Sequence, residues 1–214
     1  MKYLSVIALV ITFSISEAKS NFYFEPYLGH ETISWSADLV ETQNDRYITI
    51  KTSGLMTGPK FGLKLIKFIG AKLKFGIDAS YSILKSKYNE STSSSYDDSF
   101  IFSADASKIN GNLLVGYQAK SMGISIFVSP MTSLNFSSGF LNISQEHSYV
   151  GTTLGLNISY LIASKINLNI DYAMNTYSAL TVENTDYDLP REVSGYNHKE
   201  METQEISISL SVIF

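Results

Sequence analysis

The sequence predicts an all-β protein, an eight-stranded antiparallel up-and-down transmembrane β-barrel. Three observations lead to this fold class. Apolar and polar residues alternate with period two in eight segments, the connections between these segments alternate between short and long, and the longest apolar run lies at the N-terminus. Alternation is typical of strands with two different faces, and roughly ten residues is the length of a tilted strand that crosses a bilayer.

The N-terminus has the features of a secretory signal peptide. Lys2 supplies a positive charge, the run from Leu4 to Ile15 is almost entirely apolar, and Ser16-Glu17-Ala18 places small residues before a cleavage point. This run is too short for a spanning helix, and no later segment has the roughly 20 apolar residues that such a helix needs. We expect residues 1–18 to be a signal peptide and residues 19–214 to form one barrel domain; an uncleaved anchor is the alternative.

Composition narrows the function classes. Charged residues make up 17% of the chain, below the roughly 25% of soluble domains. The formal net charge of -4 is small, so we expect no nucleic-acid partner. The absence of cysteine excludes disulfides and thiolate metal sites. Nothing in the composition calls for a cofactor, and we expect none.

Among the first four predicted strands, the third shows the alternation most clearly. The first strand starts near Phe22, the second covers about 56–66, the third 71–84 and the fourth about 107–118. In the third, apolar residues at odd positions from 73 to 83 alternate with lysines, serines, a glycine and an aspartate. This pattern gives each strand one apolar and one polar face.

The last four predicted strands continue the same pattern to the end of the chain. The fifth starts at Gly123, the sixth covers about 149–162 and the seventh about 166–175. The eighth alternates apolar residues with Glu205 and serines, and it ends at Phe214.

The connections alternate in length. Short ones lie near 67–71, 119–122 and 163–165, and long ones, rich in Ser, Thr, Asn and Asp, near 36–54, 85–106, 137–148 and 178–202. Short turns at one end and long loops at the other are typical of transmembrane barrels. An even number of strands places both termini beside the short turns, so the four long loops are expected on the outside.

The energetic cost of placing charged side chains in lipid indicates which face of the strands contacts the membrane. If the polar rows faced outwards, Lys60, Lys64, Lys74 and two aspartates would lie at membrane depth. Each lysine there costs roughly 2–4 kcal/mol, and the sum approaches the roughly 5–15 kcal/mol that stabilises a whole domain. The apolar rows are therefore expected to face lipid.

Two alternatives remain open at this point. A soluble lipocalin-like barrel would place the apolar rows inside. Against it, the apolar rows are almost free of charge, Tyr and Phe cluster at their ends as in an aromatic girdle, and the other row, built from Gly, Ser, Asn, Lys and Asp, is too polar for an ordinary core. Residues 60–76 are also compatible with a basic amphipathic helix on a membrane surface. Pro59 and three glycines in that segment favour a strand–turn–strand hairpin instead.

The segment Phe22-Tyr23-Phe24-Glu25-Pro26-Tyr27-Leu28-Gly29, the rhythm of short and long connections, and the alternating last strand resemble the small bacterial outer-membrane β-barrel protein families. These include the OmpA-type transmembrane domain and OmpX/OmpW-like barrels. The resemblance covers the mature chain and implies an outer-membrane β-barrel domain in the bacterial cell outer membrane, with outer-membrane lipids and lipopolysaccharide as partners. It also implies that the barrel assembly machinery reads the last strand. That signal comprises Ile206, Ile208, Leu210, Val212 and Phe214. We expect no peptidoglycan-binding domain after the barrel.

The lumen of an eight-stranded barrel is filled by its own side chains, and buried charges must be paired. We expect a lumen ion-pair network that plugs and stiffens the barrel. Its members are Glu25, Lys60, Lys64, Lys74, Asp78 and Asp171. The alternative, which the OmpA-type resemblance implies, is that this network gates a narrow pore.

We expect a structural or surface-interaction role, with the long loops available to a surface partner. One alternative is a narrow pore or OmpW-like channel for small hydrophobic molecules, for which Pro26 and Pro130, where a ladder donor is missing on the lipid-facing rows, are candidate positions for an opening in the wall. A lipid-modifying outer-membrane enzyme is the other. The three histidines, His30, His147 and His198, show no spacing typical of a catalytic or metal site, so we expect no enzyme.

Overall fold

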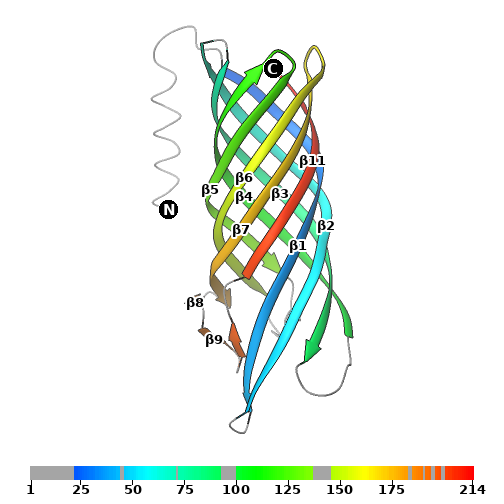
Figure 1. Cartoon of the computed structure of the whole chain (residues 1–214), viewed down its shortest axis with the longest axis vertical. Coiled ribbons are helices and arrows are strands. Elements are labelled where there is room, and N and C mark those ends of the chain that lie inside the picture. Colours follow the sequence, from blue (N-terminus) through cyan, green and yellow to red (C-terminus); the bar gives the residue numbers. More distant parts are fainter. Residues whose placement is uncertain are drawn as a thin grey trace.

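Eight long strands form the wall of a closed cylinder in the described part of the chain (Figure 1). The computed structural model describes residues 22–43, 46–70, 72–92, 100–136, 146–182, 185–189, 191–193, 196–198 and 201–214. The wall consists of β1 (Phe22–Gln43), β2 (Arg46–Ile69), β3 (Leu73–Thr92), β4 (Phe100–Ala119), β5 (Met122–Phe136), β6 (His147–Ala163), β7 (Ile166–Val182) and β11 (Met201–Val212). The last connection carries β8 (Thr185–Asp188), β9 (Arg191–Val193) and β10 (Tyr196–His198). The expected signal peptide, residues 1–18, lies outside the described residues.

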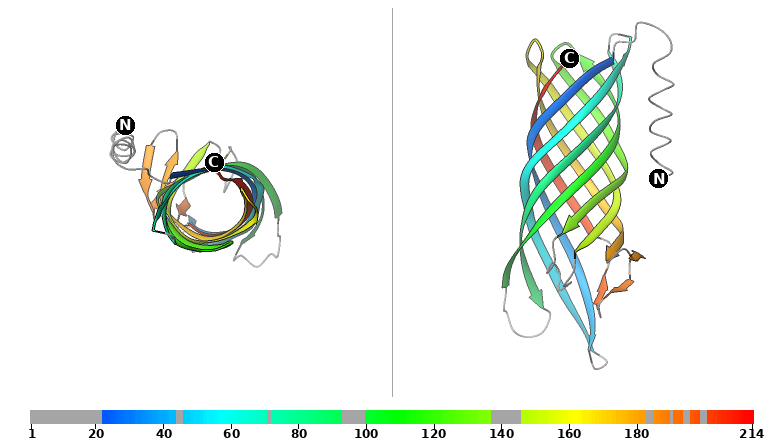
Figure 2. Two further views of the ribbon diagram at one scale, coloured as in Figure 1. Left: turned by 90° about the horizontal axis from the view of Figure 1, so that it is seen from above. Right: turned by 180° about the vertical axis from the view of Figure 1, so that it is seen from behind.

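Each wall strand pairs antiparallel with its neighbours, and the last strand pairs with the first. β11 is bonded to β7 on one side and to β1 on the other, where the ladder runs from Tyr27 opposite Ser211 to Ser36 opposite Glu202. The view along the axis in Figure 2 shows the resulting ring. The predicted eight-stranded up-and-down barrel is therefore confirmed. Among the described residues, no helix is long and apolar enough to span a bilayer.

The short turns and the C-terminus lie at the same end of the cylinder, drawn at the top of Figure 1. Gly70 takes a positive φ of 66° in the turn between β2 and β3, and Lys120 takes 51° between β4 and β5. Backbone hydrogen bonds connect neighbouring segments at this rim. Gln118 N donates to Lys72 O at 2.7 Å, and Phe214 N donates to Phe24 O at 2.9 Å. Phe214 thus joins β1 by a backbone hydrogen bond where the barrel closes at this rim.

In the half of the wall next to the short turns, apolar side chains face out and polar ones face in. On β3, Leu73 and Ile83 are 48% and 51% exposed, whereas Lys74 and Ser82 are buried. The same holds for Leu113 on β4, which is 54% exposed. The outward apolar rows together form a belt around the barrel, as expected if they contact lipid.

Beyond this belt the pattern reverses, so that apolar side chains face inward and polar side chains face outward. Leu84 points inward on β3 and is fully buried, while its neighbours Lys85 and Lys87 are exposed on the outside. Inward residues from other strands join Leu84 in an apolar cluster. Its members are Ile33, Trp35, Met56, Leu84, Ala106, Leu134, Phe136, Tyr149, Tyr177, Leu180, Val182, Leu189 and Met201. This half of the barrel follows the rule for soluble barrels because water, not lipid, surrounds it.

The expected boundaries of two long loops were wrong. The segments 36–54 and 85–106 were expected to be loops, but β1 and β2 stay paired up to Gln43 opposite Arg46, and β3 and β4 up to Glu90 opposite Phe100. These strands continue past the lipid belt since the apolar cluster inside supports them. Polar residues on the outer face therefore indicate that this part of the strand contacts solvent, and they do not mark the end of the strand.

Among the described strands, β5 is irregular on both of its sides, and the β6–β7 ladder also shifts register at Val150/Gly151 and Leu161/Ala163. The register shifts between Gly111 and Leu113 on one side of β5 and between Ser129 and Thr132 on the other, which leaves Pro130 outside both ladders. The hydroxyl oxygen of Ser129 lies 2.9 Å from Gly111 O and 2.8 Å from Met131 O, so its single proton is shared between these two backbone acceptors. A side chain thus replaces part of the backbone bonding at the bulge.

Candidate functional site

The candidate site is the filled lumen, which has three layers. The apolar cluster occupies the outer end, a cluster of four charges lies next to it, and a polar cavity lies toward the short-turn end. The layers follow from the order of inward residues along each strand. On β1, for example, Ile33, Glu31 and Glu25 belong to the three layers in turn.

The middle layer is a ring of alternating charges from four strands, which we call the charge cluster: Glu31 (β1), Lys60 (β2), Lys108 (β4) and Glu205 (β11). Lys60 Nζ lies 2.9 Å from Glu205 Oε1 and 3.5 Å from Glu31 Oε1. Lys108 Nζ lies 3.4 Å from Glu31 Oε1 and also pairs with Glu205. All four side chains are buried, so each charge depends on two opposite charges for its stability.

Of the six residues predicted for the network, only Lys60 belongs to the charge cluster. Glu31, Lys108 and Glu205 were missed, although all three lie on the polar rows and so carried the signal for a place in the lumen. Their common height depends on how β11 closes against β1, with Glu31 opposite Ser207. That register is not visible in the alternation of either strand.

The three predicted acidic residues lie in the lumen and accept hydrogen bonds from neutral groups. Asn167 Nδ2 donates to Glu25 at 3.1 Å, Asn112 Nδ2 donates to Asp78 at 2.9 Å, and Asn157 Nδ2 donates to Asp171 at 2.6 Å. The remaining donors are the hydroxyls of Ser211 to Glu25, Tyr27 to Asp78 and Ser207 to Asp171. Each carboxylate is therefore held by an amide and a hydroxyl.

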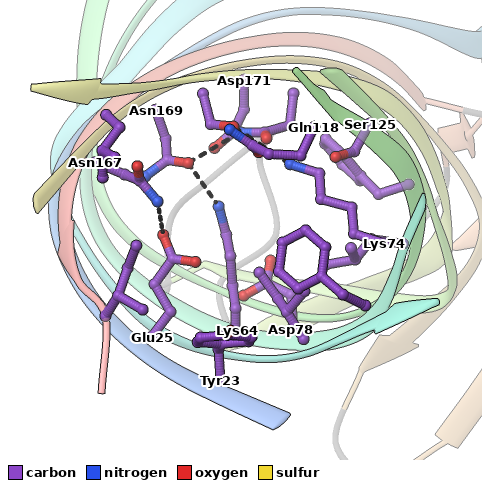
Figure 3. Close-up of a pocket in the computed structure, with 18 of the residues that line it drawn as sticks. Tyr23, Glu25, Lys64, Lys74, Asp78, Gln118, Ser125, Asn167, Asn169 and Asp171 are labelled. Carbon is purple, nitrogen blue, oxygen red and sulfur yellow. Dashed lines mark hydrogen bonds between the residues drawn. The ribbon is translucent and has the colours of Figure 1, made fainter. Parts of the chain in front are cut away.

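The two remaining lysines reach across the lumen. Lys64 Nζ donates to Asn169 Oδ1 at 3.2 Å and lies 5.1 Å from the centre of the Tyr27 ring. Lys74 Nζ donates to Ser159 Oγ at 3.3 Å. In the described part of the chain, no ion pair within 4.0 Å joins two of the six predicted residues. Figure 3 shows Lys64 and Lys74 entering the same space from neighbouring strands.

This space is a cavity of about 230 Å³. Charged residues, asparagines and apolar side chains line it, and it reaches Lys120 and Ile213 at the short-turn rim. Its lining comprises Tyr23, Glu25, Lys64, Ile66, Phe68, Lys74, Asp78, Leu114, Gln118, Lys120, Ser125, Phe127, Asn157, Ser159, Leu161, Asn167, Asn169, Asp171 and Ile213. No member of the charge cluster or of the apolar cluster is among these described lining residues. The cavity therefore lies on the short-turn side of the charge cluster and ends before reaching it.

Two aromatic rings pack against glycines on the inner wall. A Cβ added at Gly62 would lie 2.1 Å from Cζ of Tyr27, and one added at Gly155 would lie 2.2 Å from Cζ of Phe127. The missing side chains make room for the rings beside the polar cavity. Glycine on the polar row therefore has a packing role here, which the alternation alone did not reveal.

The histidines that were considered for catalysis lie apart. His147 is buried in the outer layer, where its ring stacks on Phe136 with centroids 5.4 Å apart. His30 is exposed and shares a hydrogen bond of 2.6 Å with Thr57. The side chain of His198 lies outside the described residues. Among described positions, no group of three His, Asp or Glu side chains is placed to hold a metal ion.

The residues of the expected assembly signal all lie on the lipid belt. Their exposed fractions are 56% for Ile206, 53% for Ile208, 51% for Leu210, 39% for Val212 and 69% for Phe214. Phe214 also bonds to the backbone of Phe24. These positions place an unbroken apolar row at the seam where the barrel closes.

The sequence matches a known family over nearly its whole length. The matching model is that of the outer membrane protein β-barrel domain, and it covers residues 5–214. The chain belongs to the outer-membrane β-barrel protein family. This outer-membrane barrel therefore resides in the outer membrane of a Gram-negative bacterium, with the belt of apolar side chains in contact with lipid.

Solved structures show the same fold. The outer-membrane barrel is similar to the outer membrane protein OprG from Pseudomonas aeruginosa, with a TM-score of 0.51, 11% identity, and 91% of this chain and 97% of that chain covered. It is also similar to the outer membrane protein AlkL, with a TM-score of 0.52, 10% identity, and 93% of each chain covered. No curated protein sequence matches significantly. At these identities, the likeness establishes the fold and leaves the role to be argued from the lumen.

Proposed function

We propose that this outer-membrane barrel is a closed structural protein that presents its outer end at the cell surface. The observation that carries the proposal is the pair of layers between the cavity and the outer end of the barrel. The charge cluster joins β1, β2, β4 and β11 across the lumen, and the apolar cluster fills the section beyond it. Surface partners would then meet the rigid outer half of the barrel and its connections.

Both layers oppose ion flow. An ion that entered from the cavity would have to separate Lys60 and Lys108 from Glu31 and Glu205, and these buried pairs are costly to break. It would then meet the apolar cluster, with side chains such as Tyr149 and Leu134 that are almost fully buried. A hydrophobic constriction of this kind blocks conduction by excluding water.

Planar-bilayer recording tests this proposal. The wild-type protein is expected to give no stepwise conductance, with its fold verified by heat-modifiable migration on a gel. A variant in which Leu134 and Tyr149 are both replaced by Ser is the matched control for opening the outer layer. Regular conductance steps from the wild-type protein would overturn the proposal and favour a pore gated by the charge cluster.

A channel for small hydrophobic molecules is the second candidate, and the β5 bulge favours it. Pro130 lies outside both ladders, and the hydroxyl of Ser129 supplies bonds that a regular strand would make through its backbone. Opening the wall there would connect the apolar cluster with lipid. Trp35, the only tryptophan, lies in that cluster, so its emission should shift when octane is added if such molecules enter. An unchanged spectrum would exclude this candidate.

We infer that the protein is not an enzyme. Among the described residues, His147 is buried next to the apolar cluster with its ring stacked on Phe136, whereas His30 is exposed on the outer face, where it shares a hydrogen bond with Thr57, so the two rings do not share one site. Mass spectrometry of lipid A from cells with and without the protein tests this inference. Identical lipid A is expected, and a changed acylation pattern would contradict it.

A further inference from the structure

Two lysines in the polar cavity have donors that the protein itself does not use. Among the described residues, Lys64 Nζ donates one hydrogen bond, to Asn169 Oδ1 at 3.2 Å, and Lys74 Nζ donates one, to Ser159 Oγ at 3.3 Å. Neither ammonium lies within 4.0 Å of a described carboxylate. Because an ammonium has three donors, each lysine can donate further hydrogen bonds into the cavity.

The strand pairing brings the two ammoniums to neighbouring positions. Ser159 on β6 lies directly opposite Asn169 on β7, and directly opposite side chains in a ladder have Cβ atoms about 4.5–5.5 Å apart. The two side chains that accept from Lys64 and Lys74 are therefore neighbours on one part of the wall. Both lysines line the same cavity, and Figure 3 shows them entering it from neighbouring strands.

A third donor lies beside these acceptors. Ser125 on β5 is buried and lines the cavity, and its hydroxyl has no hydrogen-bond partner among the described residues. Ser125 is opposite Asn157 on β6, and Asn157 Nδ2 donates to Asn169 Oδ1 at 3.4 Å. A buried hydroxyl that makes no hydrogen bond is costly, so this position favours an occupant of the cavity that accepts its proton.

The acidic residues of the cavity lining do not use the free donors of the lysines. Glu25, Asp78 and Asp171 each accept hydrogen bonds from one amide and one hydroxyl. The lining also contains Lys120 and so has as many lysines as carboxylates. The occupant that suits this lining supplies acceptors and carries a single negative charge, since a multiply charged anion would leave more uncompensated charge in the lumen.

Another part of the cavity wall is apolar. Leu114 on β4 is opposite Phe127 on β5, and both side chains are buried and line the cavity. Ser125 and Phe127 are two residues apart on β5 and therefore lie on the same face of the strand. An occupant that accepts the proton of Ser125 can thus place a short apolar chain against Leu114 and Phe127.

We propose that the cavity binds a small monocarboxylate with a short apolar chain. The carboxylate accepts hydrogen bonds from Lys64, Lys74 and the hydroxyl of Ser125, and the chain packs against Leu114 and Phe127. The cavity reaches the short-turn rim, so the ligand enters there and the charge cluster stays closed. The site goes beyond the role proposed above and does not depend on it.

Isothermal titration calorimetry of the purified protein in a non-ionic detergent tests the site. The probes are sodium butyrate and its neutral analogue butyramide. Butyrate is expected to bind one-to-one and to saturate, and butyramide is expected to bind more weakly by about tenfold or more, the size of one hydrogen bond to a charged group. No binding of butyrate would overturn the proposal, and so would equal binding of the two probes, because the apolar chain alone would then account for it.

Single substitutions assign the binding to this cavity. Ser125→Ala is expected to weaken butyrate binding by about tenfold, because one donor to the carboxylate is lost, and Lys74→Gln by more, because it also removes a positive charge. Ser209→Ala is the matched control. The hydroxyl of Ser209 is also buried and without a partner among the described residues, but Ser209 lies outside the cavity lining, so its loss should leave the affinity unchanged.

Heat-modifiable migration on a gel verifies that each variant is folded, and Ser125→Ala decides the test if Lys74→Gln does not fold. A folded Ser125→Ala or Lys74→Gln variant that binds butyrate as tightly as the wild-type protein would overturn the proposal. It would equally be overturned if Ser209→Ala weakened binding as much as Ser125→Ala, since the loss would then follow from removing any buried hydroxyl of the lumen.

Discussion

At the scale of single residues, the stability of the lumen depends on charges that each have two partners. Glu205 pairs with Lys60 and with Lys108, whereas Glu25 bonds only to the neutral groups of Asn167 and Ser211. Both carboxylates are buried. Their contributions to stability should nevertheless differ, because removing one member of a buried ion pair leaves its partner uncompensated.

We predict that Glu205→Gln lowers the free energy of unfolding by about 3–5 kcal/mol, since two buried lysines would then share Glu31. Glu25→Gln should cost about 1 kcal/mol, the value of ordinary hydrogen bonds. Urea titration of the folded protein in detergent, followed by the fluorescence of Trp35, measures both. Equal losses would contradict the charge cluster as the main polar support of the lumen.

The sequence was sufficient to place these residues inside the barrel but not to pair them. Lys60 and the three predicted acidic residues were assigned to the lumen from period two alone. Which charges meet depends on the tilt of the strands and on the register between β11 and β1, where Glu31 is opposite Ser207. A shift of that register by two residues would keep the same side chains in the lumen, but it would change which charged side chains lie opposite each other.

A second prediction concerns the ring of Tyr27 on Gly62. Gly62→Ala should destabilise the protein by about 1–3 kcal/mol, because the new methyl group would overlap a ring that is fixed by its bond to Asp78. Gly111→Ala is the control, since a Cβ at Gly111 meets nothing within 4 Å. Urea midpoints of the two variants provide the comparison. A loss for Gly111→Ala as large as that for Gly62→Ala would contradict this packing role.

At the scale of elements, β3 shows how one strand serves two environments. Its odd positions are apolar in the lipid belt and become lysines at 85 and 87, while its even positions change from Lys74 to Leu84. The alternation predicted the strand and its lipid-facing row. The predicted end of the strand was too early because the first polar outward residues were interpreted as a loop, although the alternation continues with its faces exchanged.

We predict that Leu84→Ala costs about 2–5 kcal/mol, since it leaves a cavity in the apolar cluster. Its neighbour Ile83 points to lipid and is 51% exposed. Ile83→Ala should therefore cost about 1 kcal/mol or less, because lipid chains fill the vacated volume. Unfolding in lipid vesicles measures both. A larger loss for Ile83→Ala would mean that the faces of β3 are assigned the wrong way round.

At the scale of the whole molecule, the barrel is organised by what surrounds it. Lipid contacts the half next to the short turns, so apolar side chains face out and polar groups fill the lumen. Water surrounds the other half, so the arrangement reverses and the apolar cluster becomes a core. Both halves use the same eight strands, and the charge cluster lies where the two kinds of interior meet.

A scan of single cysteines along β3 tests this organisation most directly, because the natural chain contains no cysteine. Each position from 73 to 87 would carry a nitroxide label in bilayers, and its collision rates with oxygen and with a water-soluble nickel complex would be compared. Odd positions up to 83 should collide mainly with oxygen, positions 85 and 87 mainly with the nickel complex, and Leu84 and Ser86 with neither. Oxygen-dominated collisions at 85 and 87, or free collisions at the even positions 84 and 86, would contradict the exchange of faces on which this account depends.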